Sequence, residues 1–213
     1  MKRILLLLLS VLMLMSFPSC KKEEEGESET TYAPSEDIEP MDISSLEISE
    51  YVKLGQYGGL EISYSPSEET RGEAVWKRVA ENSEILKYPE QQVKYYFNQL
   101  KAKYEYIAKS RNDTYANILL MLETDEEEMM AEAKSLTADD LVFYALLDAE
   151  NIELTDTDKE NNFDRYVSKF VTDYGYGEEY VRSNMSDEIY ETMLYDKTLE
   201  KLISLNEFIN AEA

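Results

Sequence analysis

The stretch LVFYALL, Leu141 to Leu147, decides the fold, because it is apolar all around a helix. Such a helix has to be surrounded by other elements of the structure. The acidic run that follows Thr124, up to Glu128, is typical of a helix N-terminus, where the helix dipole favours negative charge. We therefore predict a buried central helix from about Thr124, or from a closely following start, through Leu147.

Further helices are predicted after this central segment. Thr155 and Asp158 form a capping-box pattern, and apolar residues then recur on one face until Gly175, which supplies a helix stop. A short helix is expected over residues 178–183. Ser186 is predicted to cap a last long helix.

Before the central segment, the sequence predicts one long helix and the only credible strand. Pro89 suits the first turn of a helix, and a single apolar stripe follows it: Val93, Phe97, Leu100, Tyr104 and Ile107. The strand is indicated by Leu60, Ile62 and Tyr64, which alternate with polar residues after a Gly58-Gly59 turn. A short amphipathic stretch around Trp76 lies between them.

These patterns predict a mainly α protein, a helical bundle with one short N-terminal β segment. Residues 1–19 read as a signal peptide and 20–50 as a flexible acidic tether, since the tether is too poor in large apolar side chains to bury a core. Residues 51–88 form a remnant linker with a short strand and helix. Residues 89–213 form the helical domain.

The start of the chain, MKRILLLLLSVLMLMSFPSC, resembles a bacterial lipoprotein signal that ends at Cys20. Lys2 and Arg3 precede an apolar run that is too short to span a bilayer comfortably. Cys20 is the only cysteine, so it cannot form an internal disulfide, and acylation is its simplest use. The alternative is an ordinary signal peptide with a chance cysteine. Either way we expect an extracytoplasmic protein, lipid-anchored to a bacterial membrane in the first case.

The composition argues against several classes of function. The net charge of −24 disfavours nucleic acid and anionic lipid as partners. The chain has no histidine, which removes the commonest general base and metal ligand. The segment that starts at Asp156 invites a calcium-loop interpretation, but the required glycine and glutamate are replaced by Asn161 and Val167. We expect no cofactor, no metal and no enzymatic activity.

The remaining candidates for function are tyrosines and methionines, of which the chain has seventeen and nine. Both side chains suit surfaces that hold varied apolar partners, although each could equally fill the core. The residues predicted to contact a bound polypeptide are Tyr95, Tyr96, Tyr106, Met129, Met130 and Met193. They lie mostly on helical arms expected over 89–110 and 186–207.

Three segments resemble the trigger factor chaperones and their lipoprotein relatives. YVKLGQYGGLEI at 51–62 is similar to the entry into their prolyl-isomerase domain, and AVWKRVAENSEILKYPEQQV at 74–93 to the exit from it. Residues 138–203 resemble the helical C-terminal domain, which is related to the SurA peptide-binding domain, and this resemblance implies a helical bundle with extended arms. ALLDAENIELTDTD at 145–158 is the sharpest part.

The resemblance implies a holdase without isomerase activity, because only nine residues separate Tyr64 from Ala74, too few for the isomerase domain. Its expected partners are unfolded or partly folded secreted proteins, with the membrane contacted only through the lipid anchor. The alternative is a helical scaffold lipoprotein that grips one specific envelope partner. The oligomeric state is left open.

Overall fold

The computed structural model describes residues 38–212, and the predictions for residues 1–37, including Cys20, lie outside this range. The described chain is mainly helical, as predicted. It divides into two compact units. The first unit comprises residues 43–87 and 138–212, and the second unit comprises 38–42 and 88–137.

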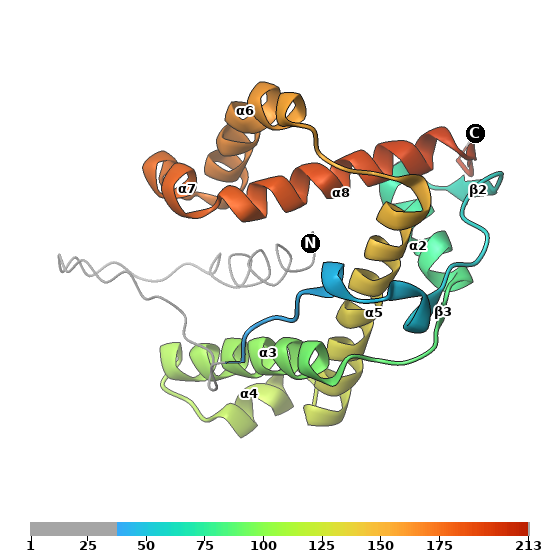
Figure 1. Ribbon diagram of the computed structural model, residues 1–213. Helices are drawn as coiled ribbons and strands as arrows, with labels where there is room; N and C mark the ends of the chain where they lie inside the picture. The colour runs from blue at the N-terminus through green and yellow to red at the C-terminus, as the bar shows by residue number, and fades with distance from the viewer. Residues whose placement is uncertain (1–37, 213) are drawn as a thin grey trace. The chain divides into compact units, whose positions relative to one another are not determined.

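The first unit contains most of the elements in Figure 1. Two 3-10 turns, η1 (Ile43–Ser45) and η2 (Ile48–Glu50), precede β1 (Val52–Lys53), β2 (Glu61–Tyr64), α2 (Arg71–Asn82) and β3 (Glu84–Ile85). The C-terminal part of α5 (Glu126–Glu150) follows, and then α6 (Asp156–Tyr174), α7 (Glu178–Asn184), α8 (Ser186–Ser204) and β4 (Glu207–Asn210).

The LVFYALL stretch lies in the main core of the first unit. Leu141, Val142 and Leu146 on α5 are buried there with Val75 and Val79 of α2. Tyr144 and Leu147, in contrast, are only half-buried and pack against the cluster. The indole N–H of Trp76 in α2 donates a hydrogen bond to Asp139 Oδ1 at 3.1 Å. The predicted burial of this stretch is confirmed for most of its side chains.

The predicted strand is confirmed as β2, with Ile62 buried and its neighbours Glu61 and Ser63 exposed. Its partner was not expected from the sequence. β2 pairs in parallel with β4, from Glu61 opposite Glu207 to Tyr64 opposite Asn210, whereas β1 pairs antiparallel with β3. A β segment at the C-terminal end therefore has to be added to the predicted fold.

Asn206 holds the start of this strand pair together. Its side chain accepts a hydrogen bond from the Leu60 N–H at 2.8 Å and donates to the carbonyl oxygens of Tyr57 and Leu202. The Gly59 N–H donates to the Leu205 carbonyl at 2.9 Å. Gly59 has a φ of 68°, which glycine adopts without strain, so the predicted glycine turn is present.

Helices α6 and α7 lie against the N-terminal part of α8 (Figure 1). The predicted capping box is confirmed, because Thr155 Oγ1 accepts from the Asp158 N–H while Asp158 Oδ2 accepts from the Thr155 N–H. Gly175 ends α6 with a φ of 73°. The prediction for Ser186 was wrong: Met185 occupies the N-cap position and Ser186 is already helical.

The second unit is built from α3 (Glu90–Ser110), α4 (Tyr115–Met121) and the N-terminal part of α5. Its core includes the predicted stripe. Leu100 is fully buried, whereas Phe97 is partly buried and packs against the edge of the core. Asp125 immediately precedes α5, and its side chain caps the start of the helix by accepting hydrogen bonds from the N–H groups of Glu127 and Glu128, both at 2.9 Å.

Two of the predicted domain boundaries need correction. The tether was predicted to extend to residue 50, but Ile43 is only 4% exposed and belongs to the core of the first unit. The helical part from residue 89 onward is not a single unit, since it divides between Thr137 and Ala138. Both errors have one cause: the segment 51–88, interpreted as a linker, supplies core residues for the chain after 138.

Candidate binding surfaces

Three of the six residues predicted to contact a polypeptide are buried. Tyr96, Met129 and Met193 are 2%, 1% and 4% exposed. Tyr96 and Met129 belong to the core of the second unit, where Tyr115 Oη donates a hydrogen bond to Met129 Sδ at 3.4 Å. These three side chains fill cores, which leaves them no surface to offer to a partner.

The other three predicted contacts, Tyr95, Tyr106 and Met130, are half-buried in the second unit. Tyr95 and Met130 pack against its core, and the Tyr95 ring centroid lies 5.4 Å from that of Tyr96. Tyr95 and Met130 therefore lie at the edge of one core and form no separate binding surface of their own.

A more exposed group of aromatic side chains lies at the turn from α6 to α7. Tyr174, Tyr176 and Tyr180, which we call the tyrosine patch, continue outward from the buried Phe170. The ring centroids are 5.4 Å apart for Phe170 and Tyr174, 6.4 Å for Tyr174 and Tyr176, and 5.9 Å for Tyr176 and Tyr180. Tyr180 is 51% exposed.

The local sequence explains how this patch is positioned. Gly175 is the left-handed C-cap of α6, and Gly177 is the N-cap of α7 with a φ of −67°. The chain therefore reverses within the three residues Gly175 to Gly177, which places Tyr176 between the tyrosines of the two helices. Rings in such offset and edge contacts stabilise one another beyond simple burial.

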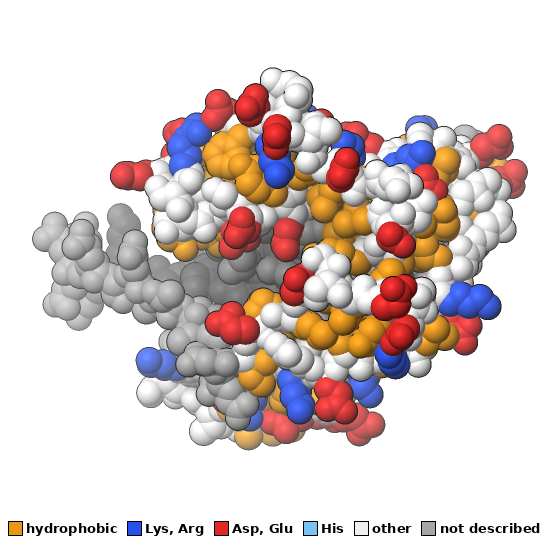
Figure 2. All heavy atoms as spheres, in the orientation of Figure 1, with side chains coloured by type: hydrophobic (Ala, Val, Ile, Leu, Met, Phe, Trp, Pro, Cys, Tyr) orange, Lys and Arg blue, Asp and Glu red, His pale blue; other side chains and the backbone are white. Residues whose placement is uncertain are grey.

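Acidic side chains surround the tyrosine patch. Partial burial raises the pKa of both Tyr174 and Tyr176, and the nearby carboxylates of Asp173 and Glu188 add to the respective increases. Arg182 on α7 is paired with Asp164 at 2.7 Å and with Glu178 at 2.9 Å. Figure 2 shows Asp and Glu side chains spread over the described surface of the face drawn, with apolar side chains between them.

A pocket of about 350 Å³ lies between α6 and α8 in the first unit. Its walls combine two cations, two carboxylates and apolar side chains; the lining residues are Arg165, Tyr166, Lys169, Asp196, Leu199, Glu200 and Ile203. Tyr166 Oη donates a hydrogen bond to Asp196 Oδ2 at 2.9 Å, and Lys169 Nζ lies 3.7 Å from the same oxygen.

Burial and the hydrogen bond to Asp196 raise the pKa of Tyr166 to about 12. The phenol therefore stays neutral near pH 7 and acts as a donor to Asp196. The Arg165 guanidinium lies 5.0 Å from the Tyr166 ring centroid, and Lys169 Nζ lies 5.7 Å from it. Two positive charges thus flank one aromatic ring at this pocket.

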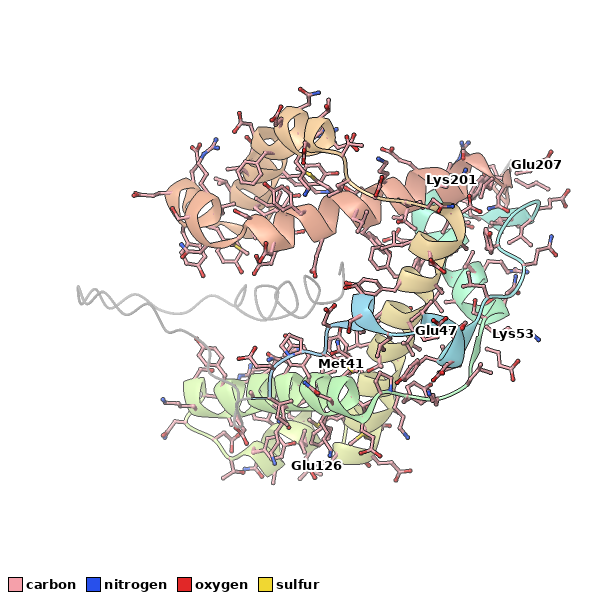
Figure 3. The ribbon with its side chains drawn as sticks, in the orientation of Figure 1. Met41, Glu47, Lys53, Glu126, Lys201 and Glu207 are labelled. Carbon is pink, nitrogen blue, oxygen red and sulfur yellow. The ribbon has the colours of Figure 1, made fainter. Side chains whose placement is uncertain are left out.

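A third polar cluster fixes the end of α5 to α8. Lys201 Nζ lies 3.2 Å from Glu150 Oε2, and Tyr57 Oη donates to Glu150 Oε1 at 2.8 Å. These contacts lower the pKa of Glu150, with the hydrogen bond from Tyr57 as the largest cause. Lys201 is labelled near the C-terminal end of α8 in Figure 3. This cluster has a structural role, because each of its three side chains has a partner within it.

Other exposed large apolar side chains are scattered over both units: Leu86, Tyr88, Leu120, Met121 and Ile209. Within residues 38–212, no group of three or more acidic side chains is placed to hold a metal ion. None of the helices in the same range is long and apolar enough to cross a membrane.

Sequence reasoning missed both the tyrosine patch and the α6–α8 pocket. A signal for the patch was present in YGYGEEY, residues 174–180, where glycines interrupt the helical pattern while tyrosines continue. The pocket had no such signal, since its residues come from two helices about thirty positions apart. No protein family, no curated protein and no solved structure shows a significant match to this chain.

Proposed function

We propose that this protein is an extracytoplasmic holdase, lipid-anchored through Cys20, that binds apolar segments of unfolded or partly folded secreted polypeptides without enzymatic activity. The single observation that carries the proposal is the tyrosine patch. It presents aromatic area on the surface of the first unit, with Tyr180 51% exposed.

The geometry of the patch supports a role in binding. Each ring is held by the next, back to the buried Phe170, so that little side-chain entropy remains to be lost when a partner binds. Tyrosine combines a large apolar face with a polar tip, which suits contacts with chains of varied sequence. Affinity for any one segment is expected to be weak and broad.

The charge of the chain supports the same function. A net charge of −24 makes molecules of this protein repel one another, which opposes aggregation of a complex that holds apolar chain. The resemblance of residues 138–203 to the helical domain of trigger factor chaperones also favours a holdase. A SurA-like arrangement of arms belongs to this proposal and is left to experiment.

The test is the aggregation of chemically unfolded model proteins, followed by light scattering, with and without residues 21–213. This fragment keeps every residue that the structure describes. We expect dose-dependent suppression with several unrelated client proteins. The double variant Tyr176→Ser/Tyr180→Ser should lose most of the suppression, whereas Tyr88→Ser/Leu120→Ser, which removes two large exposed apolar side chains elsewhere, should keep it.

Equal loss of suppression in both double variants would show that general surface apolarity, and not the tyrosine patch, holds the clients. No suppression at several-fold excess of folded, helical protein would overturn the general holdase. A scaffold that grips one envelope partner would then be the remaining proposal, to be tested by crosslinking in intact cells.

A further inference from the structure

We infer that the α6–α8 pocket is a binding site for a carboxylate attached to an apolar group of about the size of a leucine side chain, such as the C-terminal residue of a peptide or a free apolar amino acid. This inference does not rest on the holdase function, because it concerns a different site on α6 and α8. It starts from the charges at the pocket.

The guanidinium of Arg165 supplies one positive charge at the pocket. Within residues 38–212, no ion pair with a carboxylate is formed by this guanidinium, although acidic residues outnumber basic ones by 45 to 21 in the whole chain. Its position 5.0 Å from the Tyr166 ring centroid holds it at the pocket wall. A guanidinium offers a planar pair of donors that matches the two oxygens of a carboxylate.

Lys169 supplies a second positive charge one helical turn further along α6. It lies 3.7 Å from Asp196 Oδ2, while Tyr166 donates to that same oxygen at the shorter distance of 2.9 Å. Because an ammonium carries three donors and this contact occupies at most one of them, Lys169 keeps donors for a ligand. Arg165 and Lys169 together form the anion-binding side of the pocket.

The opposite wall, on α8, supplies an apolar surface and two carboxylates, of which Asp196 is already engaged by Tyr166 and Lys169. Leu199 and Ile203 are half-buried and lie one turn apart on α8, so they present a continuous surface to the body of a ligand. The volume of about 350 Å³ is at the lower end of the range for small-molecule sites, which suits a single residue. Glu200 lies beside them and can accept a ligand ammonium group.

The experiment uses residues 21–213 and three small probes, followed by ¹H–¹⁵N NMR. N-acetyl-leucine carries only the carboxylate, leucine carries carboxylate and ammonium, and N-acetyl-leucinamide carries neither charge. We expect N-acetyl-leucine to shift the amides around residues 165–169 and 196–203 with a Kd on the order of 1 mM. N-acetyl-leucinamide should bind at least about tenfold more weakly, because the charged hydrogen bonds are lost.

Leucine distinguishes the two sources of the ligand. If leucine binds more tightly than N-acetyl-leucine, Glu200 contacts the ligand ammonium group, and the ligand is a free amino acid. Tighter binding of N-acetyl-leucine favours a peptide C-terminus. Both results support the carboxylate site.

Arg165→Gln should weaken the binding of N-acetyl-leucine about tenfold. The matched control is Arg78→Gln, which removes an equal charge from an exposed site on α2, where Arg78 pairs only with Glu81 at 3.9 Å. Unchanged affinity in Arg165→Gln, equal weakening in the control, or equal binding of the amide would each overturn the inference. So would the absence of shifts at the pocket with every probe.

Discussion

The protein has two tyrosine-rich regions that use the same residue in opposite ways. On α3, Tyr96 and Tyr104 are 2% and 9% exposed and form part of the core of the second unit. At the turn from α6 to α7, Tyr176 and Tyr180 stack at 5.9 Å with an interplanar angle of 27°, and Tyr180 is 51% exposed.

The backbone explains the difference. On a long helix, residues spaced by three or four positions share one face, so an apolar stripe of tyrosines is covered by the neighbouring helices. At the helix–turn–helix junction with glycine on both sides of Tyr176, the aromatic residues follow the turn and are only partly covered: Tyr176 is half-buried and Tyr180 is 51% exposed. Tyrosines that interrupt a helical period are therefore better candidates for surface contacts than those that follow it.

The largest expected effect comes from truncating Tyr96. Tyr96→Ala should lower the free energy of unfolding of the second unit by roughly 3–5 kcal/mol, because a buried ring leaves a cavity. Tyr180→Ala should cost only about 1 kcal/mol, because the ring is 51% exposed and loses the stacking contact with Tyr176. Urea unfolding followed by circular dichroism, with amide exchange to locate the loss, measures both; a similar loss in the two variants would contradict the comparison.

Gly175→Ala should come next. Its φ of 73° strains any residue with a Cβ atom, at a cost of about 1–2 kcal/mol. Gly177 is a matched control, because a Cβ atom meets nothing within 4 Å at either position while the φ of Gly177 is −67°. Thermal unfolding should show a lower Tm for Gly175→Ala than for Gly177→Ala. We also expect weaker client binding in Gly175→Ala, since this turn carries the tyrosine patch.

The helix caps give a smaller effect of about 1 kcal/mol each. Thr155→Ala removes the capping box that begins α6, whereas Thr114→Ala removes the single cap hydrogen bond that begins α4 in the second unit. Amide exchange should increase in the first turn of α6 for the former and of α4 for the latter. If either variant raises amide exchange equally in α4 and α6, the two units do not respond separately to the loss of a cap.

The last effect is absent at neutral pH and appears only at high pH. Burial is the main cause that raises the pKa of both Tyr166 on α6 and Tyr115 on α4 to about 12. A folded-state pKa above the unfolded value of about 10 gives stability that is present below pH 10 and is lost as the pH rises to about 12. Tyr166→Phe and Tyr115→Phe should each reduce the decrease of the free energy of unfolding between pH 10 and pH 12, measured by urea unfolding at each pH. A pH dependence identical to that of the wild type would contradict the assignment.

The sequence predicted those parts of the fold that depend on local pattern. The capping box at Thr155, the stop at Gly175 and the β2 alternation around Ile62 all follow from residues within a few positions of one another. The pairing of β2 with β4 joins residues about 146 positions apart, and the residues around Asn206 carry no pattern that specifies this contact.

The candidate sites were less accessible to sequence reasoning. The helical stripe predicted an apolar face on α3, but it does not tell whether Tyr96, which flanks the stripe, is covered by a neighbouring helix. The α6–α8 pocket depends on the packing of Tyr166 against Asp196, which is a tertiary contact. Candidate sites of this kind depend on tertiary contacts, which a single sequence without a metal or nucleophile motif does not reveal.

The parallel pairing of β2 with β4 has a consequence for biosynthesis. A chain synthesised from its N-terminus presents β2 long before residues 207–210 are available to pair with it. Residues 88–137, which form most of the second unit, are complete while the first unit still lacks its final strand. The second unit, whose residues 88–137 lie in the middle of the described chain, is therefore able to fold first. The first unit closes only after almost the entire described chain has emerged.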